Sequence, residues 1–249
     1  MIAALCELYR VSGKKCYLQA AQKADDFLHQ YLYPNGKLFA SRRGDRLGAG
    51  GFLDDYAAWA FAQLSLYDAS WDHKYLQHAQ QLCNAVKEKF AAENGGFYLY
   101  ANDSEKLILR PRETYDGAIP SGNSLMAYVL VRLSHLSDEE EYSNAAKQQL
   151  DFMAADATAY PPGYAMYLWA LMEYYYPPAH LRVVADGDVN MDALRAEVGA
   201  KMNLSADVVI SQPSEQFPLQ NATTTFYVCR DQQCLPPVND LSAVVNNDK

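Results

Sequence analysis

A helical hairpin motif recurs along the chain, and it constrains the fold more than any other feature. The segment Leu8–Leu18 aligns with Leu66–Leu76, and a weaker third copy lies at Leu133–Tyr142. Each copy holds the end of one helix, a short polar turn and the start of a second helix. A repeat of about 60 residues is longer than the helix pair of a solenoid. The pattern therefore predicts helical hairpins joined by long loops and arranged as a toroid.

The two helices of each hairpin differ in character. The first helices are apolar on nearly every side, whereas the second helices carry Lys, Gln, Glu and Asp on one face. Because a helix that is apolar all round must be buried, we expect an inner layer of first helices and an outer layer of second helices. The expected inner helices are Phe52–Ala69, Ser121–Leu136 and Tyr164–Tyr176, and the expected outer helices are Tyr17–Tyr31, Tyr75–Phe90 and Tyr142–Met153.

The pattern changes after Pro177 and Pro178. Three strands are expected there with one helix, at Leu181–Asp186, Asp207–Ser211 and Thr223–Cys229 for the strands and Met191–Met202 for the helix. Such a unit is too small to be an independent catalytic domain. The prediction is a mainly α fold, with a partial (α/α)6 toroid over residues 1–178 and a small α/β C-terminal appendage over residues 179–249. The hairpins are too few to close a ring, so the chain is expected to be the C-terminal part of a longer protein.

Composition excludes several classes of partner. The chain has 249 residues, half of them hydrophobic, and a formal net charge of −9, which argues against binding nucleic acid by bulk attraction. No apolar run approaches the roughly 20 residues of a membrane span, and the N-terminus lacks the basic region of a signal peptide. Five cysteines form no small-domain disulfide framework. We therefore expect a cytoplasmic protein with no nucleic-acid or membrane partner.

The most polar segment of chemical interest is Tyr115–Ser124, which follows Arg110–Glu113. It combines two glycines, a proline, an Asp, an Asn and two serines immediately before an apolar helical run. A plain helix connection needs only a capping residue and one glycine. This composition indicates a segment that presents polar groups into a cavity.

Four strings occur in a fixed order, namely Gly50–Ala57, Asn94–Phe97, Arg110–Ser124 and Tyr227–Pro237. Together they closely resemble the C-terminal portion of the spermatogenesis-associated thioredoxin-domain protein family. The resemblance implies an (α/α)6 toroid of the six-hairpin glycosidase type, similar to N-acylglucosamine epimerases, and a thioredoxin-like domain normally in the same chain. It also implies a carbohydrate-active-like domain that binds a sugar or sugar derivative in the toroid cavity. If that domain is enzymatic, glycosidase- or epimerase-like acid–base chemistry is implied.

Three carboxylates are the candidate catalytic groups: Asp54, Asp55 and Asp116. Asp54 and Asp55 begin an inner helix, where capping is the simpler explanation and a general acid or base is the alternative. Only one of the two can point down the toroid axis, since adjacent helical residues diverge by roughly 100°. The histidines all lie on expected outer helices or at helix ends, which departs from epimerases with inner-face histidines; they are His29, His73, His78, His135 and His180.

Substrate-binding candidates surround the same segment. Arg110 and Arg112 could recognise a carboxylate or phosphate, or could form a surface ion network. Ser121 and Asn123 are natural N-caps and also candidate ligands. Aromatic rings of the inner helices could stack on a sugar or simply pack in the core, and the candidates are Tyr56, Tyr164 and Trp169.

Cys229 and Cys234 are a redox candidate, with a structural thiol pair as the simpler alternative. Two ligands cannot close a zinc site, and no phosphate-loop, dinucleotide or serine-hydrolase motif is present, so no metal and no cofactor are predicted. The rival function is a non-catalytic client-binding or scaffold module of a thiol-redox protein. Exposed inner helices would also favour a homodimer.

Overall fold

The computed structural model describes residues 1–105, 108–137, 139–185, 187, 189–201, 206–230 and 233–245. The chain forms two compact units, Met1–Tyr175 and Tyr176–Lys249. Asp186 and Met202, the expected last residues of a strand and a helix, lie outside the described residues.

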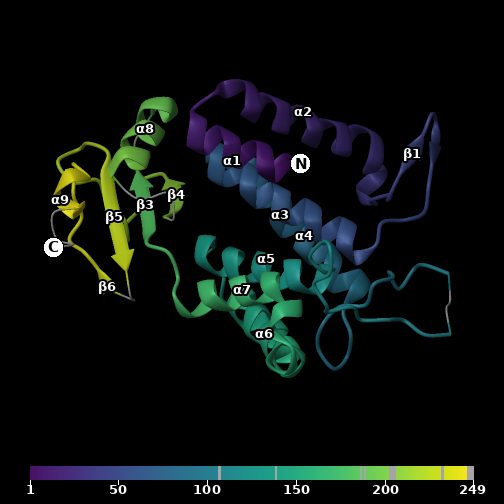
Figure 1. Ribbon diagram of the computed structural model, residues 1–249. Coiled ribbons are helices and arrows are strands. Elements are labelled where there is room, and N and C mark those ends of the chain that lie inside the picture. The colour runs from purple at the N-terminus through teal and green to yellow at the C-terminus, as the bar shows by residue number, and fades with distance from the viewer. Residues whose placement is uncertain are drawn as a thin grey trace. The chain divides into compact units, whose positions relative to one another are not determined.

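The first unit consists of helical hairpins in two layers (Figure 1). The inner helices are α1 (Ile2–Ser12), α3 (Leu53–Ser70), α5 (Gly122–Leu136) and α7 (Ala165–Tyr175). The outer helices are α2 (Lys15–Leu32), α4 (His73–Phe90) and α6 (Glu140–Ala159). Each inner helix packs against the next inner helix, and each outer helix packs against the inner helix that precedes it. The mainly α class and the alternation of inner and outer helices, as in a partial (α/α) toroid, are therefore confirmed.

Burial follows this layering in the middle of the unit. Most side chains of α3 and nearly all of α5 are buried, as their apolar composition predicts. The expectation of complete burial is wrong for α7, in which only Met166, Tyr167 and Ala170 are buried. The exposed side chains of α7 include Leu168, Trp169, Met172 and Tyr175. A helix at the end of a row of inner helices has one fewer neighbour to cover it.

The repeated sequence encodes a repeated turn. Gly13 and Trp71 occupy aligned positions, and both adopt the left-handed conformation, with φ of 68° and 54°. Their N–H groups bond back to the carbonyls of Tyr9 and Tyr67. Glycine adopts this conformation without strain, whereas tryptophan does so at some cost. The second helix then starts two residues later in each hairpin, and at α4 Asp72 is its N-cap.

The long loops converge on the amino-terminal end of α3. Leu53 N–H donates to the carbonyl of Leu99 at 3.0 Å, and Leu99 N–H donates to the carbonyl of Pro111 at 2.8 Å. The loop before α3 contains a short hairpin that was not predicted, formed by β1 (Arg42–Arg43) and β2 (Arg46–Leu47). Single 3-10 turns at Pro34–Gly36 and Pro161–Gly163 complete the connections.

The second unit is a four-stranded sheet with two helices. Its strand order is β4-β3-β5-β6, with β3 (His180–Val184), β4 (Asp207–Ser211), β5 (Thr225–Arg230) and β6 (Gln233–Cys234). Strands β3 and β4 are parallel and are connected through α8 (Met191–Lys201), whereas β5 and β6 are antiparallel to their neighbours. A short α9 (Ser242–Val245) ends the described chain. In the part of the chain that the structure describes, no helix is long and apolar enough to span a membrane.

Candidate functional site

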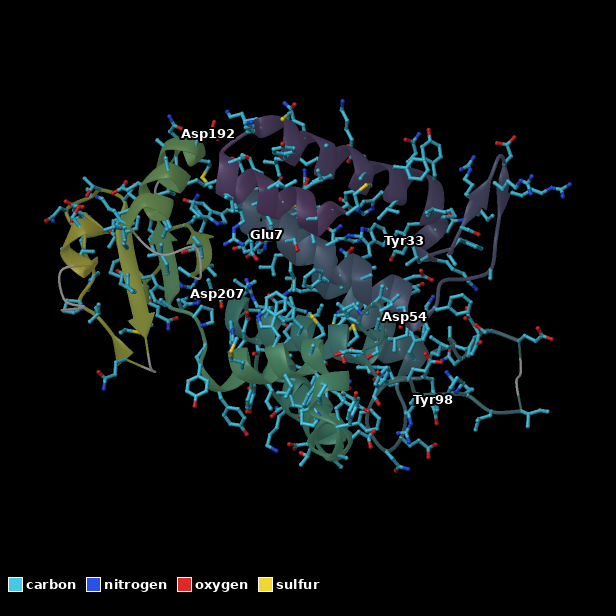
Figure 2. All side chains as sticks on the ribbon, viewed as in Figure 1. Glu7, Tyr33, Asp54, Tyr98, Asp192 and Asp207 are labelled. Atoms are coloured by element: carbon cyan, nitrogen blue, oxygen red, sulfur yellow. A yellow bond between two sulfur atoms is a disulfide. The ribbon has the colours of Figure 1, made fainter. Side chains whose placement is uncertain are left out.

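The first turn of α3 holds the start of α5. Asp54 Oδ1 accepts a hydrogen bond from the backbone N–H of Gly122 at 2.8 Å (Figure 2 labels Asp54). Its other oxygen, Oδ2, has no hydrogen-bond partner among the described residues. A side chain at position 122 would collide with Asp54 and Leu53, which explains the glycine. A carboxylate here also interacts favourably with the positive end of the α5 dipole.

The next two residues of α3 point elsewhere. Asp55 Oδ2 accepts from Phe52 N–H at 2.8 Å, so Asp55 caps its own helix. Tyr56 is buried, accepts from Leu38 N–H through its hydroxyl oxygen, and packs its ring against Phe90. Tyr56 lines a cavity of about 340 Å³ together with residues including Lys37, Lys89, Tyr100 and Asp103. The predicted divergence of neighbouring helical side chains therefore separates these three residues.

Asp116 links the starts of two inner helices. Its Oδ1 accepts from Ser121 N–H at 2.9 Å, at the N-cap of α5. Its Oδ2 accepts from Met166 N–H at 2.9 Å and more weakly from Tyr167 N–H at 3.4 Å, in the first turn of α7. Both carboxylate oxygens thus satisfy orphan N–H groups at helix termini.

Ser121 and Asn123 bond to the protein itself. Ser121 is the N-cap of α5 and accepts from Ser124 N–H at 3.1 Å. Asn123 is completely buried; its Oδ1 accepts from Phe97 N–H, and its Nδ2 donates to the carbonyls of Phe97 and Glu113 at 2.9 and 2.8 Å. Gln149 donates to the same oxygen from α6. Asn123 therefore joins α5, α6 and two loops.

Arg110 and Arg112 hold the loops. Arg110 donates to the carbonyl of Tyr100, and its guanidinium lies 4.1 Å from the ring centroid of Tyr98. Arg112 donates to the carbonyl of Gly95 at 2.8 Å and lies over the ring of Phe152. Neither arginine is paired with Asp116 in the structure.

The aromatic candidates also separate. Tyr164 is buried, with its hydroxyl 3.4 Å from Thr114 Oγ1. Trp169 is 42% exposed, packs against Tyr128 and donates from Nε1 to Glu173. Two tyrosines absent from the predicted set, Tyr115 and Tyr160, are 57% and 55% exposed and their rings are parallel at 6.4 Å. Their exposure depends on the folded loop, so composition gives no signal for it.

An electrostatic pair remains at the amino ends of α3 and α5. Partial burial raises the pKa of the Asp54 carboxyl, the bond from Gly122 opposes this, and the nearby charges of Glu113 and Asp55 raise the pKa further. Glu113 is exposed and its carboxylate accepts no hydrogen bond from the described residues, although its backbone carbonyl accepts one from Asn123. Two carboxyl groups in unlike environments are the usual arrangement for acid–base work or for binding hydroxyl groups. Glu113 is thus added to the three aspartates as a candidate catalytic residue.

A buried polar cluster lies between α2, α3 and α4 and was not predicted. Asp25 Oδ1 accepts from Trp59 Nε1 at 2.8 Å and from Gln63. The rings of His29 and His78 lie 4.2 Å apart beside them. Both histidines are on outer helices, as predicted, but His78 is only 7% exposed. No group of three or more metal-ligating side chains occurs within the described ranges.

Cys229 and Cys234 are joined by a disulfide between β5 and β6. Cys229 is half-buried and Cys234 is exposed. The other three cysteines are free thiols, of which Cys6 and Cys83 are buried and Cys16 is exposed. The structure thus joins the predicted pair of cysteines.

No protein-family model matches the chain. The uncharacterized protein B0495.5 of Caenorhabditis elegans is 28% identical over 95% of this chain and 35% of its own length. A solved structure of cellobiose 2-epimerase from Bacillus thermoamylovorans is similar with a TM-score of 0.49 and 17% identity, over 61% of this chain and 42% of that chain.

Mammalian relatives of the chain share the name spermatogenesis-associated protein 20. Spermatogenesis-associated protein 20 of rat is 29% identical over 57% of this chain and 20% of its own length. The human protein of that name is 25% identical over 76% of this chain and 26% of its own length. The chain thus spans about a third or less of these relatives. The spermatogenesis-associated protein 20 proteins are therefore homologues of this chain over part of their length.

Proposed function

We propose that the helical unit is part of a carbohydrate-active-like domain that binds a sugar or sugar derivative at the amino-terminal ends of α3 and α5. Asp54 and Glu113 would accept hydrogen bonds from sugar hydroxyls. Tyr115 would offer its exposed ring to the apolar face of a pyranose. We also propose that the whole protein carries a thioredoxin-like domain in the same chain and is cytoplasmic.

The observation that carries this proposal is the unequal carboxyl pair. Asp54 is half-buried, its Oδ2 has no hydrogen-bond partner in the described part of the chain, and burial raises its pKa. Glu113 lies close enough to raise that pKa further. If the site is catalytic, Asp54 would be the general acid and Glu113 the general base.

Four other predicted residues would keep the site in place without contacting the sugar. Asp55, Asp116, Ser121 and Asn123 fix the helix ends and the loops through backbone hydrogen bonds. Groups held in this way keep neighbouring ligand-binding side chains in place. The catalytic assignment among the three aspartates would then fall on Asp54.

Ligand titration tests the proposal. We would record saturation-transfer NMR and calorimetry of the 249-residue chain with neutral monosaccharides, disaccharides, N-acyl sugars and sugar phosphates. At least one sugar is expected to bind. Asp54→Asn and Glu113→Gln should each weaken its affinity about ten-fold, because each removes one charge-assisted hydrogen bond. Asn keeps the acceptor for Gly122, so the fold is retained. The matched control is Asp151→Asn, an exposed carboxylate on α6.

Two results would overturn the sugar site. One is no binding of any sugar in the panel by the folded wild-type chain. The other is binding that both variants leave unchanged while circular dichroism reports an intact fold.

A non-catalytic client-binding or scaffold module is the second candidate. It is favoured by the same backbone hydrogen bonds, because they occupy nearly every polar side chain of the Asp116–Ser124 segment. Exposed apolar side chains of α7, including Met172 and Tyr175, would then contact a client or a second copy of the chain. Under this proposal no sugar raises the melting temperature, whereas an unfolded client peptide binds and protects α7 from hydrogen exchange.

A further inference from the structure

A row of reactive side chains crosses the sheet of the second unit. Register pairs Asp207 of β4 with His180 of β3, His180 with Cys229 of β5, and Cys229 with Cys234 of β6. Side chains of directly paired residues lie on the same face of a sheet. A carboxylate, an imidazole and two sulfur atoms are therefore neighbours in that order. Asp207 is labelled on its strand in Figure 2.

Exposure increases along the row, from Asp207, which is 1% exposed, to Cys234, which is exposed. The residues that alternate with the row are buried, namely Leu181 and Val183 on β3 and Phe226 and Val228 on β5. His180 and Cys229 are half-buried and Cys234 is exposed. A reagent in solution can therefore reach Sγ of Cys234 without opening the core.

The disulfide is a local link rather than a long-range one. Its cysteines are five residues apart, and the turn already connects β5 to β6. Leu235 N–H also donates to the carbonyl of Val228 at 2.9 Å. A disulfide that closes so short a loop removes little entropy from the unfolded chain. Its opening would free β6 while β3, β4 and β5 keep their ladders.

We propose that the Cys229–Cys234 disulfide is a thiol–disulfide exchange site that opens on reaction with an external dithiol. A thiolate of the dithiol attacks Sγ of Cys234, and Cys229 leaves as a thiolate. The second thiol of the dithiol then attacks its own sulfur in the mixed disulfide and releases Cys234. The dithiol loses two electrons and two protons and becomes a disulfide, and the two cysteines gain them and become thiols.

His180 is the neighbour that assists the leaving group. Its imidazole stands next to Cys229 in the register, and a protonated imidazole stabilises an adjacent thiolate. Asp207 follows on the other side, in the order of groups that orients an imidazole in catalytic triads. Two other charged or titratable side chains are described on this face of β3 and β5. They are Arg182 and Tyr227, which pair with each other two residues away from His180 and Cys229. His180 and Asp207 are positioning residues in this proposal.

Thiol trapping on the whole chain tests the exchange. The oxidised protein is treated with dithiothreitol, quenched with a maleimide at successive times and analysed by peptide mass spectrometry. Labelling of both cysteines with unchanged circular dichroism is expected, and full reoxidation by glutathione disulfide should follow. Burial raises the pKa of Cys6 and Cys83 to about 12, so these thiols serve as internal reporters of global unfolding.

Variants resolve the order of attack and the role of His180. Cys229→Ser leaves the exposed Cys234, which should react with glutathione disulfide, forming the mixed disulfide and releasing glutathione, about ten-fold faster than the Cys229 of Cys234→Ser. His180→Gln should slow reduction about ten-fold at pH 7 with an unchanged melting temperature. Tyr227→Phe, one position along the same face, should stay within about two-fold. Reduction only together with labelling of Cys6 and Cys83 would overturn the proposal, and equal rates in His180→Gln would remove the histidine from it.

Discussion

The backbone N–H of Gly122 donates to Asp54 Oδ1 at 2.8 Å, so the first turn of one inner helix is fastened to the first turn of the next. Asp116 repeats the arrangement between α5 and α7. Consecutive inner helices are therefore joined at their amino ends by carboxylates that satisfy orphan N–H groups. We propose the sugar site at these same ends.

Gly122→Ala is expected to destabilise the chain by about 2 kcal/mol, because the added methyl group meets the Asp54 carboxylate and lies 2.7 Å from Leu53 Cγ. Urea unfolding followed by circular dichroism measures the change. Gly50→Ala is the matched control, since its methyl group would meet only the end of the Lys37 side chain. Equal midpoints for the two variants would contradict the close approach.

Asp116→Ala is expected to cost about 2–3 kcal/mol in the free energy of unfolding, because N–H groups at the starts of two helices lose their acceptor. Asp116→Asn should cost less, since one amide oxygen still accepts. Asp151→Ala removes a carboxylate whose side chain is 66% exposed and should change stability by less than about 0.5 kcal/mol. A loss for Asp116→Ala as small as this control would contradict the linking role.

Asn123→Asp should destabilise the chain by about 3 kcal/mol or more. The change replaces two donors by a carboxylate at a site with no exposed surface, which leaves the carbonyls of Phe97 and Glu113 unsatisfied. Thermal and urea unfolding at pH 7 measure the loss. Asn144→Asp, at an exposed position of α6, should be nearly neutral. The new carboxylate is fully charged at high pH, so the variant should not regain stability there. An increase in its stability at high pH would contradict this prediction.

The stability of the chain should fall in mild acid because of His78. Burial, with a smaller contribution from the charge of His29, lowers the pKa of His78 from 6.5 to about 4. The unfolded chain binds this proton near pH 6.5 and the folded chain does not, so stability is complete above pH 6.5 and is lost as pH falls toward 4. The loss amounts to about 3 kcal/mol over that window.

His78→Phe should remove this part of the pH dependence. Neither ring nitrogen of His78 has a partner among the described residues, so an apolar ring should be tolerated at pH 8. Urea unfolding of both proteins between pH 8 and pH 4.5 measures the difference in slope. Parallel curves would show that His78 does not titrate as proposed.

The layered helices could be predicted because burial follows local composition. The apolar segments at Phe52–Ala69 and Ser121–Leu136 form α3 and α5 within one residue of the expected bounds. Ser121 is the N-cap that its residue type suggested. The hairpin of β1 and β2 was missed, because its four paired residues include three arginines and carry no alternation of apolar and polar residues.

The hydrogen-bond partners of individual polar residues could not be predicted, because these partners lie far away in the chain. Asp54 and Asp55 are equally good caps by sequence, yet one bonds to α5 and the other to its own helix. The arginines were expected to bind a ligand or to form a surface ion network. Instead, Arg110 donates to the carbonyl of Tyr100, 10 residues earlier, and Arg112 donates to that of Gly95, 17 residues earlier.

By itself the sequence determined the class of fold, the order of inner and outer helices and the position of the polar segment, since periodicity and composition act over one or two helical turns. Only the tertiary structure decided that Asp54 Oδ2 has no hydrogen-bond partner among the described residues, that His78 points inward, and that His180 and Asp207 align with the cysteines. These outcomes depend on helix ends and strand register, and both are fixed by contacts between segments that are distant in the chain.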